Sequence, residues 1–334
     1  MVFFPLGPIL LMQDMIRSAP ASDRKHAATP FGRLIVRLIA ELETSMVAAG
    51  VRALDGDLDR AIIFMVVARA SEMLSPHGAG HAGGEGRAAK AISINALAAS
   101  LGRPFETMRR HIHALCAAGL CARGPAGVTV PEAVHGRAEI VALFRGNHDA
   151  LVRMVEDMHD FGVPLPETRP HIGYDWHTGL AAAHDVLLTG IEFHAHRFQS
   201  WTDLVLANAI LCANARPLSR NRDLALAYAN FGPAPPDALL QPVSTGSIAR
   251  ALGLPPSTAH RRVAVMIESG ILVRRARGVV VAEKALSDPD RIEESRTSML
   301  HVRQILIRLA AGGFRFDDPA ANYRDRRPKP LQIA

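Results

Sequence analysis

The fold is decided by residues 244–283, STGSIARALGLPPSTAHRRVAVMIESGILVRRARGVVVAE. At the start of this stretch, Ile248 and Leu252 share one face of a short predicted helix. Gly253 ends that helix in a tight turn, because only glycine adopts a left-handed backbone at little cost. Two prolines then favour the first turn of a second helix, where the N–H groups have no partners within the helix in any case.

The second helix is predicted to run from Pro255 to about Ser269 and to turn one apolar face inward. Its inward residues recur at helical spacing and are Ala259, Val263 and Met266. Gly270 ends this helix, and residues 271–282 alternate around Arg275–Gly278 as the two strands of a β-hairpin do. A helix, a tight turn, a second helix and a two-stranded wing together predict a winged helix-turn-helix.

The same pattern occurs twice in the chain. Residues 93–132 align without a gap on residues 244–283 at a constant offset of 151, with thirteen of forty positions identical. Glycines follow the predicted helices in both copies, and apolar residues recur at the same positions. An ungapped register of this length indicates an internal duplication. Residues 92–133 are called the first unit here, and residues 241–286 the second unit.

Helix-periodic stretches flank each unit, so each half of the chain has the order helix, helix, unit, helix. The predicted division is an N-terminal segment 1–30, a first half 31–162, a Pro-rich linker 163–178, a second half 179–313 and a basic tail 314–334. The predicted flanking helices are 31–50, 57–74, 136–161, 179–199, 202–215, 220–230 and 288–311. The Gly-rich residues 76–90 predict a loop. The polar tail predicts disorder, with Arg324–Lys329 as a non-specific contact to DNA.

The inward residues of the second predicted helix determine which of its side chains face outward. At about 100° per residue from Val263, Thr258 and Arg261 point away from the core, and Ser257 and His260 lie beside them. This face would enter the major groove of DNA, and the wing arginines would reach phosphate or the minor groove. The predicted DNA contacts of the second unit are Ser257, Thr258, His260, Arg261, Arg262, Arg274, Arg275 and Arg277. Seven basic and two acidic residues give this unit a net charge of +5.

The first unit carries less positive charge, with four basic and two acidic residues and a net charge of +2. Its second helix presents Glu106, Thr107, Arg109 and Arg110 outward, and its wing carries Arg123 alone. A carboxylate repels phosphate, but it accepts a hydrogen bond from a cytosine amino group. The predicted DNA contacts of this unit are Thr107, Arg109, Arg110 and Arg123. A role in packing alone is the alternative.

The stretch SIARALGLPPSTAHRRVAVMIESGILVRR, residues 247–275, resembles the DNA-binding unit of the IclR and MarR groups of bacterial transcriptional regulators. Its part GLPPSTAHR is most similar to recognition helices of the IclR type, which implies that Ser257, Thr258, His260 and Arg261 face DNA. The resemblance covers about forty residues of each copy. IclR proteins carry one such unit near the N-terminus, followed by an effector domain. Here the better match lies near the C-terminus, so the resemblance does not imply that domain. The flanking helices resemble the MarR arrangement, in which terminal helices form the dimer interface.

Composition narrows the remaining possibilities. Aromatic residues are only 5% of the 334 residues, which favours a helical core of Ala, Leu, Val and Ile over a β-sandwich. The net charge of +6 rests on 34 Arg and 4 Lys. Arginine suits phosphate and guanine recognition, although GC-rich codon usage also produces this bias. Three cysteines fit neither a disulfide framework nor a zinc site, and no apolar run is long enough to span a membrane.

Motifs for catalysis or metal binding are not found. Twelve of the fifteen histidines lie between His77 and His196, but pairs such as His194 and His196 fall on different sides of a helix. Packed or solvated histidines are therefore expected rather than a metal site. No phosphate loop, nucleophile elbow or paired-carboxylate motif occurs. We expect no enzyme activity, no cofactor and no metal.

The sequence as a whole predicts a mainly α-helical protein with two winged helix-turn-helix units, each flanked by helices and carrying a short β-hairpin wing. The predicted function is a sequence-specific transcriptional regulator that binds double-stranded DNA in the cytoplasm, at the nucleoid, as a monomer or a homodimer. Two alternatives are a plasmid-type replication initiator with two winged helices and a winged-helix module that bridges proteins or organises chromosomes. The ungapped register between the two units argues against the replication initiator. The net charge of +5 on residues 241–286 argues against the bridging module. The sequence does not indicate an effector ligand.

Overall fold

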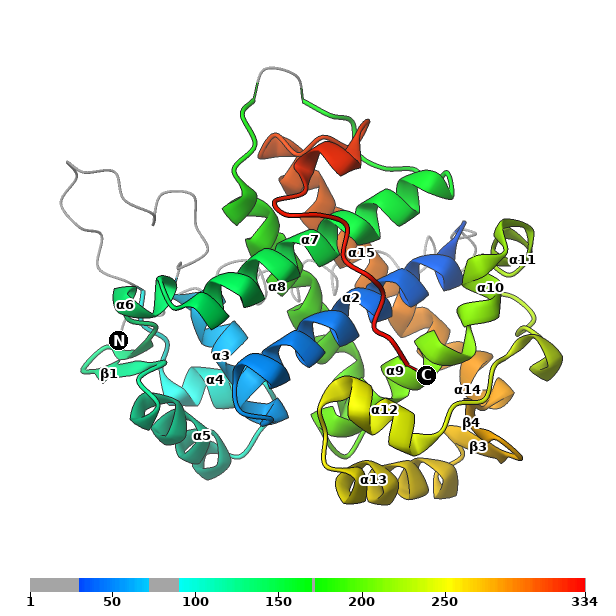
Figure 1. The fold of residues 1–334 in the computed structure, drawn as a ribbon, viewed down its shortest axis with the longest axis horizontal. Coiled ribbons are helices and arrows are strands. Elements are labelled where there is room, and N and C mark those ends of the chain that lie inside the picture. Colours follow the sequence, from blue (N-terminus) through cyan, green and yellow to red (C-terminus); the bar gives the residue numbers. More distant parts are fainter. Residues whose placement is uncertain (1–29, 72–89, 170–171, 334) are drawn as a thin grey trace, which may run out of the picture.

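The computed structural model describes residues 30–71, 90–169 and 172–333, which Figure 1 shows as a ribbon. This part of the chain is mainly α-helical and contains two short antiparallel hairpins, as the sequence predicts. The predicted N-terminal segment (1–30) and loop (76–90) lie almost entirely outside the described residues. Within these ranges, no helix has both the length and the apolar character needed to cross a membrane.

The first half begins with two helices close to their predicted positions, α2 (Gly32–Ala53) and α3 (Leu58–Ala70). The side chain of Asp57 accepts a hydrogen bond from the backbone N–H of Arg60 and so starts α3. The first unit contains α4 (Ile94–Ser100), α5 (Phe105–Ala117), β1 (Ala122–Gly124) and β2 (Gly127–Thr129). A short helix, α6 (Glu132–His135), and a long one, α7 (Ala138–Asp160), complete the half.

The second half has the same order with additional short elements before its unit. Two helices and a 3-10 turn come first: α8 (Trp176–His194), η1 (Ala195–Arg197) and α9 (Trp201–Asn214). The additional elements are α10 (Arg216–Arg220), α11 (Arg222–Ala227) and η2 (Asp237–Leu239). The second unit and its flank are α12 (Thr245–Leu252), α13 (Pro256–Glu268), β3 (Leu272–Arg275), β4 (Gly278–Val281), α14 (Glu283–Leu286) and α15 (Pro289–Ala311). The predicted helix 220–230 is shorter in the structure, where it ends at Ala227. It begins at Arg222 because the side chain of Asn221 accepts from the N–H of Leu224 and so starts α11.

Three helices of the first half have the same bounds as three helices of the second half at the offset of 151. Helices α5, α6 and α7 begin and end 151 residues before α13, α14 and α15. In each unit an isolated bridge joins the wing to the residue two before the first helix, Ile92 to Val128 and Val243 to Val279. A Cβ on Gly278 would lie 2.2 Å from the carbonyl oxygen of Val243, so only glycine allows this approach.

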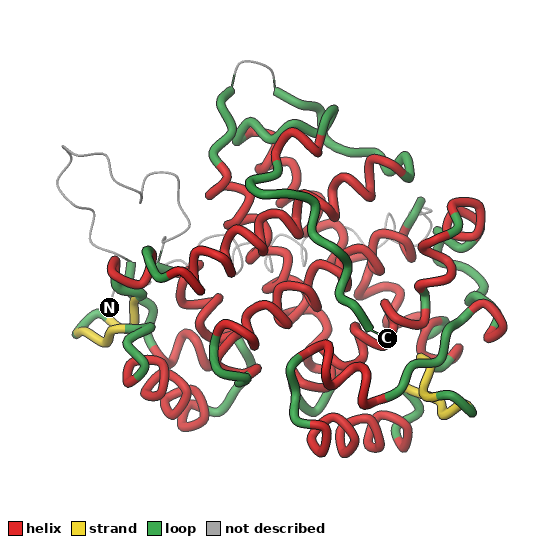
Figure 2. Tube along the Cα trace, in the orientation of Figure 1, coloured by secondary structure: helices red, strands yellow, loops and turns green. Residues whose placement is uncertain are grey.

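One continuous hydrophobic core joins both halves. Helix α2 packs against α7 of its own half and α9 of the other, and α8 packs against α7 and α15. Figure 1 shows α5 and α13 along the same lower edge of the molecule, and Figure 2 shows the two hairpins at its opposite outer ends. The helical core therefore fixes both units on one side of the molecule.

The predicted linker 163–178 extends too far into the second half. The side chain of Asp175 accepts a hydrogen bond of 2.9 Å from the backbone N–H of His177. This cap starts α8 at Trp176, so the last three residues of the predicted linker are helical.

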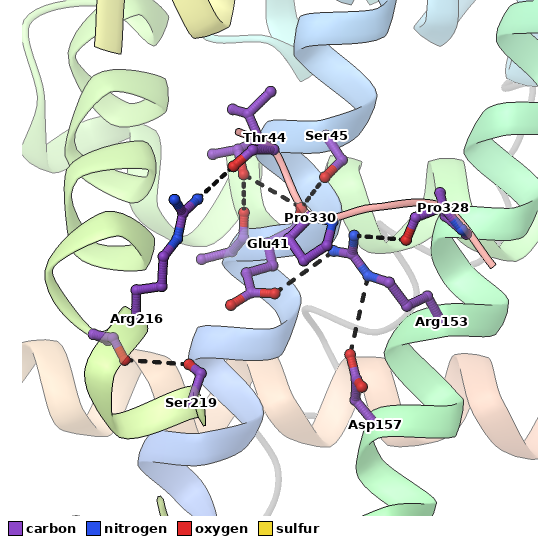
Figure 3. A network of polar contacts seen from close by, with 12 residues as sticks. Glu41, Thr44, Ser45, Arg153, Asp157, Arg216, Ser219, Pro328 and Pro330 are labelled. Carbon is purple, nitrogen blue, oxygen red and sulfur yellow. Dashed lines mark hydrogen bonds and ion pairs between the residues drawn. The ribbon is translucent and has the colours of Figure 1, made fainter. Parts of the chain in front are cut away.

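The predicted disorder of the tail is wrong. Residues 314–333, called the C-terminal segment below, lie across α7 and α2 (Figure 1), and their last residues bind Arg153 of α7 and Arg216 of α10 (Figure 3). The carboxylate of Asp149 on α7 accepts backbone N–H groups at 2.9–3.2 Å from three consecutive residues, Arg324, Asp325 and Arg326. Arg153 donates to the carbonyl oxygen of Pro328. Arg216 donates to the carbonyl oxygens of Leu331 and Ile333.

Side chains of the C-terminal segment are also held by the helices. Phe314, Phe316 and Ile333 are buried. Arg327, which belongs to the basic run predicted to touch DNA, forms ion pairs with Glu156 and Asp157 of α7. Polar composition suggested disorder, but these partners are distant in sequence and satisfy the backbone that the segment itself leaves unpaired.

Candidate nucleic-acid interface

Helix α13 presents the predicted reading face of the second unit. Its predicted inward residues Ala259, Val263 and Met266 are buried. On the opposite side, Ser257, His260 and Arg261 are exposed, and Thr258 is half-buried. The turn before α13 has Gly253 in the left-handed region at a φ of 70°, as its position after α12 predicts. This part of the expected surface is therefore free to meet a groove of DNA.

Arg262 is placed differently from the prediction. Its Nε donates to Oδ1 of Asp203 on α9 at 2.5 Å, and its Nη2 donates to Oδ2 of the same carboxylate. The side chain of Asp203 is 2% exposed, and that of Arg262 is 18% exposed. The pair raises the pKa of Arg262 mainly through the hydrogen bond to Asp203. Arg262 therefore lies at the edge of the reading face and attaches α13 to α9, so it is a structural contact rather than a free cation.

The wing of the second unit carries three exposed arginines. Arg274 and Arg277 extend from the hairpin formed by β3 and β4. Arg275 instead forms an ion pair with Asp237 of η2, through its Nε at 3.0 Å and its Nη2. Since a paired guanidinium already has a counter-charge, Arg275 offers DNA less positive charge than its two neighbours.

Asn214, at the end of α9, was not singled out in the sequence. Its side-chain amide donates to the carbonyl oxygens of Gln241 and Val279 at 2.8 and 3.1 Å. Its Oδ1 accepts the backbone N–H of Val281 at 2.9 Å. These bonds join α9 to both ends of β4 and to the entry of the second unit. None of these bonding partners is near Asn214 in the sequence, so nothing local marks it.

The first unit has the same shape with fewer free cations. Arg110 and Arg123 are exposed, and Thr107 is half-buried. The exposed Arg109 donates to Oε2 of Glu106 at 2.8 Å, so these two opposite charges partly cancel. The inward residues Ile112 and Leu115 are buried as predicted.

The second helices of the two units, α5 and α13, both start near the turn between α2 and α3. A Cβ on Gly253, just before α13, would meet Val51 of α2 at 3.1 Å. Arg103, just before α5, lies 3.9 Å from Asp59 of α3. From this centre the two helices run outward to wings on opposite sides of the molecule (Figure 1). The two candidate DNA-facing surfaces are thus arranged around the middle of one edge, in opposite directions.

A buried carboxyl lies between the two halves and was also not singled out in the sequence. Glu43 of α2 is 7% exposed, and its Oε2 accepts a hydrogen bond of 2.9 Å from Asn208 of α9. Its Oε1 has no hydrogen-bond partner among the residues with described positions. Burial raises the pKa of Glu43 to about 8, and the bond from Asn208 offsets only part of this shift. On sequence alone Glu43 is one more glutamate of an amphipathic helix.

The histidines do not form a metal centre in the described part of the chain, where no group of three or more His, Cys, Asp or Glu is placed to hold an ion. Burial lowers the pKa of His184 to about 4, and it lowers that of His194 to a similar value. The Nδ1 of His184 lies 2.8 Å from the carbonyl oxygen of Leu180, whereas its Nε2 has no hydrogen-bond partner among the described residues. Both residues are therefore neutral packing groups at neutral pH.

One part of the second unit is similar to a known family of DNA-binding domains. The family model of the IclR helix-turn-helix domain matches residues 238–276, which run from η2 through α12 and α13 to β3. The searches found no matching curated protein and no matching solved structure. The matched domain points to a regulator rather than an enzyme. Residues 238–276 thus match an IclR-type helix-turn-helix domain, and this match supports a DNA-binding regulator of transcription.

Proposed function

We propose that one chain presents two winged-helix units to DNA and regulates transcription by binding two neighbouring half-sites. The observation that carries this proposal is the placement of α5 and α13 on one edge of a shared core (Figure 1), with α5, α6 and α7 each 151 residues before α13, α14 and α15. In this view the chain is an internal duplication, in which the first half is 31–162 and the second half begins with α8 and ends at residue 313, with a linker between them and the C-terminal segment after them. A duplicated chain would then replace a dimer of single-unit proteins.

The second unit supplies most of the affinity in this proposal. Ser257, Thr258, His260 and Arg261 would face the major groove, because they line the outer side of α13. Arg274 and Arg277 would bind phosphate from the wing, with a smaller part for the paired Arg275. In the first unit, Thr107, Arg109, Arg110 and Arg123 would make the corresponding contacts. Such binding would associate the chain with the nucleoid.

The arrangement of the two units favours an inverted repeat. Because α5 and α13 run outward from one centre, equivalent residues of the units meet DNA in opposite directions. The two reading faces differ, so the half-sites should be related but unequal. Their centres should lie about one helical turn, roughly 10 base pairs, apart. Simultaneous binding would raise the affinity above that of either unit through effective concentration.

Footprinting combined with the mass of the complex in solution tests this proposal. Sites selected from random DNA by the full-length protein would be footprinted with hydroxyl radicals, and the mass of the same complex would be measured. One chain that protects both halves of an imperfect inverted repeat is the expected result. Two chains on a strict palindrome, each protecting DNA only through the second unit, would contradict it.

A further inference from the structure

The first turn of α9 contacts both DNA-binding units. Trp201 and Asp203 lie two residues apart in this turn, and each touches a different unit. We propose that this turn sets the distance and angle between the two recognition helices and thereby selects the spacing of the two half-sites. This inference rests on the proposed function, in which both units bind DNA together.

The contact with the second unit is the ion pair between Asp203 and Arg262 of α13. Both carboxylate oxygens of Asp203 accept from the guanidinium, so the pair is bidentate. Bidentate pairs define orientation as well as distance, because two parallel bonds resist rotation. The carboxylate is almost completely buried, and the side chain of Ser200 caps the same turn by accepting from the N–H of Asp203. The position of α13 is therefore fixed relative to the start of α9.

The contact with the first unit is made by Trp201. The guanidinium carbon of Arg103 lies 4.3 Å from the centre of the indole ring, which is cation–π geometry. Arg103 occupies the turn between α4 and α5, one residue before the N-cap of the recognition helix. Trp201 is 2% exposed and so offers a fixed surface. The turn that starts α5 is thus held against the other half of the chain.

The remainder of α9 prevents its first turn from moving independently. The helix is buried along most of its length and packs against α2. Asn208 binds Glu43 of α2, and Asn214 binds the wing of the second unit. Weakening one of the two contacts at its first turn should therefore free one unit to turn, while leaving the rest of the helix in place.

A series of DNA duplexes with altered half-site spacing tests this inference. The separation of the two half-sites would be changed one base pair at a time over about one helical turn, and each added pair rotates one half-site by about 35°. The wild-type chain should prefer one spacing to its neighbours by about tenfold or more. The variants D203N and R103M should reduce this preference to about threefold or less, while they leave affinity for an isolated half-site unchanged. The matched control R145A removes an exposed guanidinium from α7 and should retain the wild-type preference.

Circular dichroism must first confirm that the variants are folded. A sharp preference in the wild-type chain that both variants retain would overturn the role of α9 and leave the proposed function intact. A wild-type chain with no preference and no gain from a second half-site would contradict the proposed function itself. If D203N does not fold, R103M tests the same turn from a partly exposed position on the other unit.

Discussion

In the second unit, Arg262 attaches the recognition helix to α9 through a bidentate pair with Asp203, whereas the first unit has His111 at the equivalent position. The Nε2 of His111 lies 3.9 Å from Asp59 of α3, too far for a hydrogen bond. The wing of the second unit is likewise attached by more hydrogen bonds than the wing of the first unit. Asn214 makes three hydrogen bonds around the second wing, whereas Ser71 at the same end of α3 is buried with its Oγ unpartnered in the described structure.

The two units have the same fold but are attached to the rest of the molecule by different contacts. Local periodicity and glycine positions give both units the same helices and hairpins. Long-range polar contacts then hold the second unit more firmly, and this unit also carries more free arginines on its outer surface. A firmly held and more basic unit is suited to dominate binding, because less freedom is lost when it docks.

The largest effect on stability should come from Glu43. This residue lies in the core that both units share, where α2 of the first half meets α9 of the second half. Between pH about 4.5 and about 8, only the unfolded chain releases the proton of this carboxyl, because burial raises its pKa in the folded state. The free energy of unfolding should therefore fall with rising pH by up to about 1.4 kcal/mol per pH unit. E43Q should lack this contribution, as measured by urea unfolding from pH 5 to 9. Parallel curves for the two proteins would show that Glu43 is not buried in this way.

Next in size is the loss of the wing attachment in N214A. This variant leaves the N–H of Val281 and the carbonyl oxygens of Gln241 and Val279 without their partner. An unfolding free energy about 3 kcal/mol lower is expected, since each unsatisfied buried group costs about 1–3 kcal/mol. The matched variant in the first half, S71A, should stay within about 0.5 kcal/mol of wild type because the Oγ of Ser71 has no hydrogen-bond partner among the described residues. Equal losses in denaturant unfolding would remove this difference between the units.

The comparison also ranks the recognition helices. Arg261 and Arg110 occupy equivalent positions and are both exposed. R261A should weaken specific binding by about 1–3 kcal/mol, and R110A should weaken it less, because the second unit carries the greater charge. Fluorescence anisotropy on a selected site measures both. Binding that survives R261A but not R110A would reverse the ranking.

The smallest effect concerns the wings. R277A should reduce the slope of log affinity against log salt concentration by about one, because a phosphate contact releases about one counterion. R275A should change this slope less, since Asp237 already neutralises that guanidinium. Both variants should weaken specific and random DNA alike. A changed sequence preference with an unchanged salt slope would place these arginines at base edges instead.

Much of each unit follows from the sequence by itself. The spacing of Ala259, Val263 and Met266 identifies the inner face of α13, and the glycines mark the turns and wings. These features depend on backbone conformation and on periodicity over a few residues, which the sequence contains directly. For the same reason, the constant offset of 151 is sufficient to predict equivalent elements in both units.

Contacts between distant segments determine how the charged groups are used. Arg262 has the same local sequence signal as Arg261, yet its distance from Asp203 along the chain is 59 residues and nothing local reveals the pair. The C-terminal segment has the composition of a disordered tail, but Asp149 and Arg216 supply partners for its backbone from both halves. The role of a charged side chain depends on the partner that folding places beside it, and these partners are distant in the sequence. Helices and turns depend on neighbours in sequence, and this is why the sequence determines the units but not their attachment.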